Sequence, residues 1–185
     1  SLHDALPILR ERVVRDEAAV VAGHLARDGG AIARRRLLQA QDARIQGAGL
    51  QVENQVAPAL QLLGERFLLQ QALANLLDNA LDFTPPGGVL RWSAQVQGEF
   101  LELCLFNQGE PIPDYALPRL TERFYSLARP ISGRKSTGLG LNFVQEVVNL
   151  HGGTLRVLNR ADGVEVHVRL KRLAVQALLG VPVAA

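Results

Sequence analysis

The clearest hydrophobic pattern in the chain lies between Glu65 and Phe83. Apolar residues recur there at intervals of three and four, which predicts a helix with one buried face. Thr84 ends this helix, because the residue before a proline is disfavoured in the helical region. A second helix is predicted from about Gly140 to Leu150, and the glycines of His151–Gly153 end it.

Short runs with partial alternation of polar and apolar residues predict strands between and after these helices. The predicted strands are Leu50–Val56, Leu60–Leu63, Val89–Val96, Phe100–Phe106, Thr154–Leu158 and Val164–Leu170. The turn Gln97–Glu99 joins two of them into a hairpin. The pattern predicts an α+β two-layer sandwich, in which a mixed, largely antiparallel sheet is packed on one face by helices.

The chain of 185 residues is long enough for one domain with additional segments. Residues 1–47 form an N-terminal helical segment in this interpretation, consistent with a remnant of a dimerisation or linker region. Residues 48–172 form the domain, and residues 173–185 form a C-terminal tail. The sequence contains no methionine, so we expect a fragment of a longer protein.

Charge and cysteine content narrow the possible classes of protein. The net charge of +2 at pH 7 gives no reason to expect a nucleic-acid partner. Cys104 is the sole cysteine, so the chain cannot form an internal disulfide, and its apolar neighbours predict a buried strand position. The sequence has no apolar run approaching the ~18–20 residues that a membrane-spanning helix needs.

A long irregular segment, Asn107–Thr137, precedes the second helix, with a short helical piece expected near Ala116–Phe124. Such segments inside compact domains are usually functional. The segment leads into Gly138–Leu141, where glycines permit close backbone approach and a helix start offers free N–H groups to phosphate oxygens. The alternative is an ordinary helix start capped by Ser136 or Thr137.

A stripe of amide side chains crosses the otherwise apolar helix Glu65–Phe83. Gln71, Asn75 and Asn79 follow one another at four-residue steps and therefore share one face. Amide oxygens suit a magnesium–phosphate site, because they coordinate the cation without adding negative charge. The solvated face of an amphipathic helix explains the same stripe.

Asn107 stands where a predicted strand meets a turn rich in glycine and proline. This place can put its amide on the floor of a pocket, facing the edge of an adenine ring. An asparagine amide both donates and accepts, and adenine offers a matching donor–acceptor pair. An ordinary strand-to-loop turn is the alternative.

Four short motifs follow one another along the chain. They are Asn75-Leu-Leu-Asp-Asn79-Ala80, Asn107-Gln-Gly109-Glu-Pro-Ile-Pro113, Glu122-Arg-Phe124-Tyr125 and Gly138-Leu-Gly140-Leu141. In this order and spacing they resemble the N, G1, F and G2 boxes of the ATP-binding domain of sensor histidine kinases, in the GHKL superfamily. The resemblance covers roughly residues 50–170 and looks especially like the CreC-type sensor kinases. It implies the Bergerat fold, with ATP and Mg²⁺ as ligands.

The resemblance also implies roles for single residues. Asn79 would coordinate Mg²⁺ and, with Asn75, would form the catalytic pair. Asn75 stands where ATP-hydrolysing relatives carry a water-activating Glu; asparagine cannot act as that base, which favours phosphoryl transfer over hydrolysis. Asn107 would face adenine, and residues 114–137 would form a mobile lid. The residues implied in nucleotide binding are Asn75, Asn79, Asp82, Phe83, Asn107, Gly109, Ile112, Phe124, Lys135, Ser136, Thr137, Gly138, Leu139, Gly140 and Leu141.

Three residues depart from the pattern of the family. Asn107 replaces an aspartate and so lacks a charged acceptor for adenine. Pro111 replaces a glycine and stiffens its loop. Asp82 stands where a basic residue often meets phosphate. The first two departures put the nucleotide affinity in doubt.

The chain has no match to the phosphoacceptor motif His-Glu-x-x-x-x-Pro. His3 has its proline one residue too early, and His24 has no acidic neighbour. His151 belongs to a helix end and is predicted to be structural. We therefore expect the phosphoacceptor histidine on a dimerisation domain outside this chain.

The resemblance implies the catalytic domain of a bacterial two-component sensor histidine kinase. It would pass the γ-phosphoryl of Mg-ATP to a histidine on the dimerisation domain of the same kinase, from which a response regulator would take it. The full-length protein would be a homodimer anchored in the inner membrane, with this domain in the cytoplasm. Two alternatives stay open: a degenerate pseudokinase or interaction module, and a serine kinase of the anti-sigma type.

Overall fold

The computed structural model describes residues 41–56, 64–130, 133 and 135–171. Five strands in this part of the chain form one sheet in the order β1-β2-β3-β5-β4. Their bounds are β1 Gln51–Gln55, β2 Val89–Gln97, β3 Phe100–Gln108, β4 Thr154–Arg160 and β5 Gly163–Lys171. The predicted strand Leu60–Leu63 lies outside the described residues, as do most of the N-terminal helical segment and the C-terminal tail.

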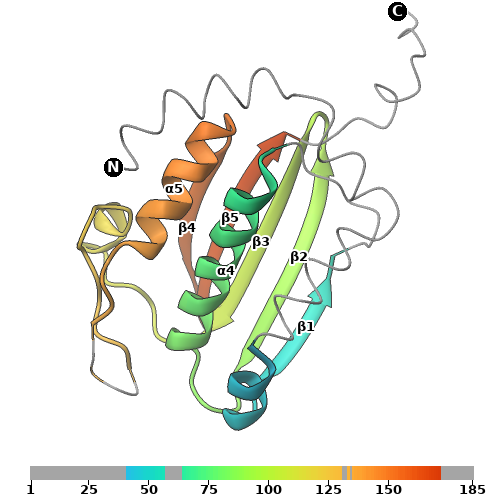
Figure 1. Ribbon diagram of the computed structural model, residues 1–185. Helices are drawn as coiled ribbons and strands as arrows, with labels where there is room; N and C mark the ends of the chain where they lie inside the picture. Colours follow the sequence, from blue (N-terminus) through green and yellow to red (C-terminus); the bar gives the residue numbers. More distant parts are fainter. Residues whose placement is uncertain (1–40, 57–63, 131–132, 134, 172–185) are drawn as a thin grey trace, which may run out of the picture.

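The two predicted long helices are α4 (Arg66–Phe83) and α5 (Gly140–Leu150), and they lie side by side on one face of the sheet (Figure 1). Strand β1 runs parallel to β2, and all the other pairings are antiparallel. This arrangement confirms the predicted α+β sandwich with a mixed sheet. Among the described residues no helix combines the length and the apolar character that a bilayer span requires.

Local sequence sets both ends of α4. The Glu65 carboxylate caps its start by accepting a hydrogen bond from the Leu68 N–H at 2.6 Å. At the other end, the N–H and the hydroxyl of Thr84 both donate to the Ala80 carbonyl, at 3.0 and 2.6 Å. Pro85 has no N–H to continue the ladder. The predicted helix therefore starts and stops where capping and proline dictate.

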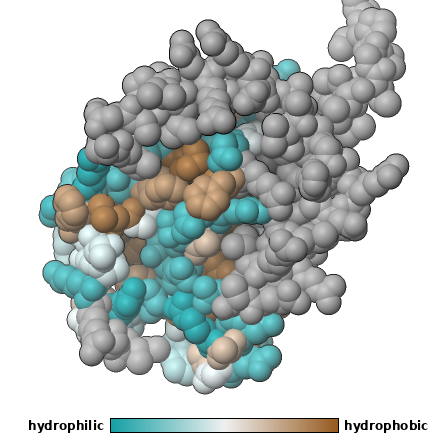
Figure 2. Space-filling model, viewed as in Figure 1, coloured by the Kyte–Doolittle hydropathy of each residue, from teal (hydrophilic) through white to brown (hydrophobic). Residues whose placement is uncertain are grey.

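The sheet has two chemically different faces. Leu101, Leu103 and Leu105 of β3 point to the helices and belong to the buried core, as do Val168 and Leu170 of β5. Because successive side chains of a strand alternate, the residues between them point to the opposite side, here called the open face. On the helix-bearing side, polar side chains lie between patches of apolar ones (Figure 2).

The predicted helical piece near Ala116–Phe124 is much shorter than expected. Only Leu117–Arg119 is helical, as the 3-10 helix η1. The Phe124 N–H donates to the Gly138 carbonyl at 3.0 Å instead of continuing a helix, and Phe124 has a φ of 64°. A contact far along the chain thus overrides the local helical tendency.

His151 fastens the end of α5 to the start of α4. Its Nε2 accepts a hydrogen bond from the Glu65 N–H at 2.9 Å, and its Nδ1 donates to the Val147 carbonyl at 2.7 Å. Gly64 lies against the ring, where a Cβ would collide with it. The structural role predicted for His151 is confirmed by these contacts.

We predict that His151→Ala lowers the free energy of unfolding by about 1–3 kcal/mol, because it leaves the part-buried Glu65 N–H without its partner and removes one of two hydrogen bonds to the Val147 carbonyl. Urea unfolding followed by circular dichroism measures the change. Asn149→Ala on the exposed surface of α5 is the matched control and should stay within about 0.5 kcal/mol of wild type. Equal stability of both variants would show that the histidine is not a structural link.

Candidate functional site

A cavity of about 120 Å³ lies between the helices and the sheet, beneath the segment that leads from β3 to α5. Eight residues predicted for nucleotide binding line it: Asn79, Phe83, Asn107, Ile112, Ser136, Gly138, Gly140 and Leu141. They come from α4, the end of β3, the loop after it and the start of α5. With Tyr125 of the third motif, which also lines the cavity, the fold gathers parts of all four sequence motifs around one cavity.

Seven other predicted residues are not part of this lining: Asn75, Asp82, Gly109, Phe124, Lys135, Thr137 and Leu139. Phe124 is 76% exposed and turns away from the cavity, because its positive φ and its bond to Gly138 direct the side chain outward. Its neighbour Tyr125 lines the cavity in its place. The aromatic motif is therefore present at the site through a different residue than expected.

The sequence reasoning missed most of the apolar lining. The missed apolar and aromatic residues are Leu76, Ala80, Leu105, Leu120, Tyr125, Leu127, Val157, Val164 and Val166, and two polar lining residues, Glu110 and Ser126, were missed as well. The strand residues among them follow the same alternation as core residues, so the pattern does not distinguish a cavity wall from the core. Glu110 and Tyr125 lie within the quoted motifs and Ser126 directly follows one, so counting every residue of each motif and its next neighbour would have found all three.

The polar end of the cavity lies where α4 faces the start of α5. A Cβ at Gly140 would lie 3.9 and 4.0 Å from the Asn79 amide nitrogen and oxygen. Gly138 has a φ of 68°, and a Cβ there would lie 2.5 Å from the Phe124 carbonyl carbon. Gly138 therefore permits an approach that a side chain would block, whereas a Cβ at Gly140 would only make van der Waals contact with Asn79. The first N–H groups of α5 have no partner within the helix and can receive anionic oxygens.

Asn107 also lines the cavity and is only 7% exposed. Within the described residues its side chain makes no hydrogen bond, so the buried amide has donor and acceptor capacity for a ligand. Gly163 of β5 pairs with the next residue, Gln108, and a Cβ at Gly163 would collide with the Asn107 backbone carbonyl. A glycine on β5 thus permits the close approach of the Asn107 backbone.

The loop after Asn107 is held by one asparagine of β4. Asn159 accepts from the Ile112 N–H and donates to the Ile112 carbonyl, both at 2.8 Å. Pro111 and Pro113 lack N–H groups, so Ile112 offers the one backbone donor of the three. The stiffness expected from Pro111 is therefore combined with a two-point attachment to the sheet.

Asp82 joins the irregular segment to the helices. Its carboxylate pairs with Arg129 at 2.6 Å and with Arg44 at 2.7 Å, and Arg44 also contacts Asp78 at 2.8 Å. The Arg129 Nε is buried and lacks a hydrogen-bond partner among the described residues. Where the family often has a basic residue on the helix, this chain has an acid that holds a basic residue of the neighbouring segment.

The segment 121–138 folds back on itself and on α5. Ala128 pairs with Lys135 in an isolated bridge, and the Ser126 hydroxyl donates to the Ser136 carbonyl at 3.0 Å. The Asn142 amide of α5 donates to the Thr121 carbonyl at 2.8 Å. One of these two side-chain hydrogen bonds is exposed and the other is part-buried, so among the described residues few contacts hold the segment and it can open locally.

Residues 64–174 match the family described as histidine kinase-, DNA gyrase B-, and HSP90-like ATPase, and the chain belongs to this family. The match includes both helices, β2 to β5 and the whole cavity. The fold and the site therefore define an ATPase-type nucleotide-binding domain, as the motif resemblance indicated.

Individual relatives are sensor kinases. The chain is 51% identical to the sensor protein CreC of Escherichia coli K12 over 109 residues, which is 58% of this chain and 23% of CreC. A structure of the mycobacterial sensor histidine kinase MprB is 31% identical, with a TM-score of 0.65, covering 77% of this chain and 93% of that one. The catalytic domain of histidine kinase ThkA shares the fold at 22% identity and a TM-score of 0.69, covering 77% and 93%. ThkA also has a structure in complex with the response regulator protein TrrA, at 20% identity and a TM-score of 0.65 over 77% and 40% of the chains.

We predict that Asp82→Asn loosens the segment around Arg129. Partly exposed ion pairs contribute only about 0.2–1 kcal/mol each, so global stability should fall by less than about 2 kcal/mol. Amide hydrogen exchange in residues 125–130 should become faster.

The matched control is Glu53→Gln, which removes a carboxylate from a single pair with Arg91 at 2.6 Å, away from the cavity. This variant should leave exchange in the segment unchanged. Equal exchange in Asp82→Asn and wild type would mean that the ion pair does not hold the segment.

Proposed function

We propose that this chain is the catalytic ATP-binding domain of a two-component sensor histidine kinase. In this proposal it binds Mg-ATP and passes the γ-phosphoryl group to a histidine on a separate dimerisation domain. The observation that carries the proposal is the juxtaposition of the Asn79 amide with Gly140 at the start of α5. It brings a ligand for a hard cation next to free N–H groups that suit phosphate.

The cavity residues form two groups, one suited to the adenine ring and one suited to the phosphates. Asn107 and Phe83 would contact adenine, where apolar walls favour a flat ring and one amide can read its edge. Asn79, Gly138 and Gly140 would lie along the phosphates. Asn75, one turn of helix from Asn79, would border this end rather than the cavity itself.

The size of the cavity implies movement of the segment above it. Pockets for whole small molecules usually have volumes of about 300–1,000 Å³, against about 120 Å³ here. A nucleotide would therefore displace part of segment 114–137, the proposed lid. Ser136 lines the cavity now, and Lys135 and Thr137 flank it, so all three would meet the phosphates from the lid side.

Magnesium fits the donor set at the polar end. The amide oxygen of Asn79 is a neutral hard ligand, and Mg²⁺ would neutralise charge on the transferred phosphoryl group. Arg129, with its buried Nε and its tether to Asp82, would bring positive charge from the lid toward the same end.

Transfer is favoured over hydrolysis because Asn75 and Asn79 cannot act as general bases. The domain would act mainly by holding the γ-phosphoryl group in line with an acceptor nitrogen. The acceptor would be a histidine on the dimerisation domain of the same kinase, in a homodimer, with a response regulator taking the phosphoryl group. The complex of ThkA with TrrA supports a regulator as the second partner. The sensor kinases among the relatives support a cytoplasmic place for this domain in a membrane-anchored protein.

Two alternatives have specific support. The changes at Asn107 and Pro111 favour a degenerate nucleotide-binding pseudokinase or interaction module. A serine kinase of the anti-sigma type would need no phosphoacceptor histidine. The 51% identity to a sensor protein favours the histidine kinase.

We predict that Mg-ADP binds this chain and that Asn79→Ala removes the magnesium-dependent part of the affinity. At a nucleotide concentration one hundred times its dissociation constant, stability should rise by about 2.7 kcal/mol. Calorimetric titration with and without Mg²⁺ measures the effect.

The matched control is Gln71→Ala, two turns earlier on the same stripe and exposed. This variant should bind Mg-ADP like wild type. An unchanged magnesium dependence in Asn79→Ala would refute the assignment of Asn79.

We predict no histidine autophosphorylation of this chain alone, and label transfer when the dimerisation domain is added in trans. The reason is proximity, since the acceptor must lie against the γ-phosphate. Radiolabelled ATP and a test for acid-labile label measure the transfer. Acid-labile label on the isolated chain would contradict the prediction. Acid-stable label on serine would favour the anti-sigma type, and nucleotide binding without any label would favour the pseudokinase.

A further inference from the structure

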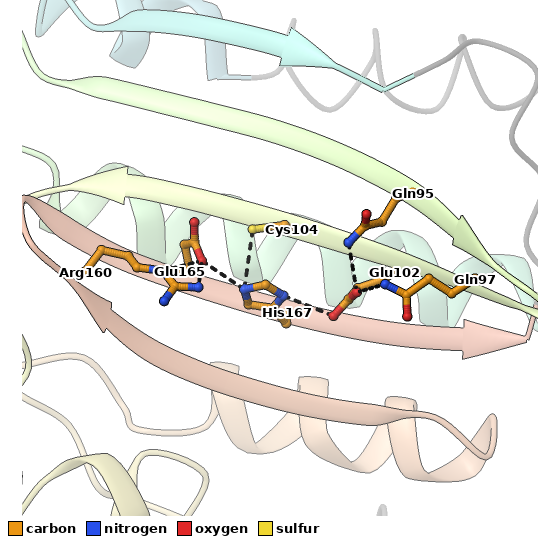
Figure 3. A network of polar contacts seen from close by, with 7 residues as sticks. All are labelled: Gln95, Gln97, Glu102, Cys104, Arg160, Glu165 and His167. Atoms are coloured by element: carbon orange, nitrogen blue, oxygen red, sulfur yellow. Dashed lines mark hydrogen bonds and ion pairs between the residues drawn. The ribbon is translucent and has the colours of Figure 1, made fainter.

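A second cluster of reactive side chains lies on the open face of the sheet, on the side away from the helices and the nucleotide cavity. Cys104 of β3 pairs directly with His167 of β5, and Glu165 lies two residues before His167 on the same face. The Cys104 Sγ is 3.7 Å from the His167 Nε2, which is 3.0 Å from the Glu165 Oε2. Figure 3 shows the three side chains pointing toward one another.

The separations match those of metal ligands. One ligand atom from each residue lies within 4.8 Å of the others. In a tetrahedral zinc site with bonds of ~2.0–2.3 Å, neighbouring ligand atoms are about 3.5 Å apart. The observed 3.7 and 3.0 Å lie on either side of this distance, so small side-chain rotations would complete the geometry.

The histidine ring is already oriented for this role. Its Nδ1 contacts the Glu102 Oε1 at 3.1 Å, which leaves Nε2 directed at Cys104 and Glu165. Gln95 and Gln97 in turn donate to the other oxygen of Glu102, at 3.2 and 2.8 Å. Metal-binding histidines commonly have a carboxylate behind the ring, which fixes its tautomer and direction.

Arg160 and the protonated Cys104 thiol both compete with a cation at this cluster. Burial opposes ionisation of Glu165, but hydrogen bonds from Arg160 and His167 outweigh it and hold the pKa of Glu165 below its usual range. A cation would share this carboxylate with Arg160, whose Nε lies 2.6 Å from it. Burial, and next the charge of Glu165, raise the pKa of the Cys104 thiol to about 11. Binding must therefore displace a thiol proton and should weaken as the pH falls.

We propose that Cys104, Glu165 and His167 form a binding site for Zn²⁺, with three protein ligands and a fourth position open to water. Thiolate and imidazole ligands select zinc-like cations over hard cations such as Mg²⁺, so this site would be chemically distinct from the nucleotide site. The metal would link β3 to β5, and the opposite face of the same two strands forms part of the cavity wall. The proposal does not depend on the proposed kinase activity.

The test is a titration of the metal-free, reduced chain with Co²⁺, a spectroscopic substitute for Zn²⁺. We expect one equivalent of Co²⁺ to produce a thiolate-to-cobalt charge-transfer band, which Zn²⁺ then abolishes by displacement. Because Cys104 is the sole cysteine, such a band reports on this residue alone. Lowering the pH from 8 to 6 should weaken binding, since the thiol proton competes.

Variants make the test specific. Cys104→Ser should abolish the band, and His167→Gln should lower Co²⁺ affinity at least tenfold. Glu102→Gln should weaken binding about 10–100-fold while keeping the band at saturation, because it acts through the ring. Glu53→Gln, a carboxylate on the same strand-rich face that pairs with Arg91, is the control and should bind like wild type.

Circular dichroism of each variant shows whether it is folded. Absence of the band in the folded wild-type chain would overturn the proposal, and so would a band of unchanged affinity in folded His167→Gln. Co²⁺ binding without a thiolate band would show that other side chains hold the metal, and would overturn it equally.

Discussion

The structure depends on the burial of two amphipathic helices against the same face of one sheet. Leu76 and Leu77 of α4 and Val144 of α5 are almost fully buried there, against the leucines of β3. Burial of side chains of this size contributes about 1.5–3 kcal/mol each, so this layer dominates the stability. The helices can pack this way because His151 fixes the end of one to the start of the other. The candidate cavity lies in the same layer and is lined by residues of α4, of the start of α5 and of the sheet.

The polar side chains of the candidate site adjoin this apolar layer. Asn79 and Asn107 line a cavity whose walls are mostly apolar, and a glycine of β5 permits a close backbone approach beside Asn107. The segment from Thr121 to Gly138, which includes most of the proposed lid, is attached differently, through the ion pair of Asp82 with Arg129 and through two side-chain hydrogen bonds, one exposed and one part-buried. A cavity formed by rigid elements and covered by a segment with few attachments suits a site that admits and releases a nucleotide, as we propose.

Strand alternation divides the chemistry of the sheet between its two sides. On β3, Leu103 and Leu105 serve the core and the cavity, while Glu102 and Cys104 face the other way. The same division on β5 separates Val166, beside the cavity, from His167 on the open face. A ligand on the open face would therefore act on the strands that form the cavity wall, without touching the nucleotide.

The sequence by itself determined the two long helices, the five strands of the described sheet and the sandwich, because period, proline and capping residues act locally. The spacing of the motifs also identified Asn79, Asn107 and the glycines of α5 before any contact was known, and the cavity gathers them. Contacts between distant segments decided the rest. Phe124 points outward because its N–H donates to the Gly138 carbonyl. Asp82 forms ion pairs with Arg129 and Arg44 and so links the irregular segment to the helices. The register of β3 with β5 places Cys104 opposite His167. These outcomes follow from strand pairing and loop closure, which local residue patterns do not encode.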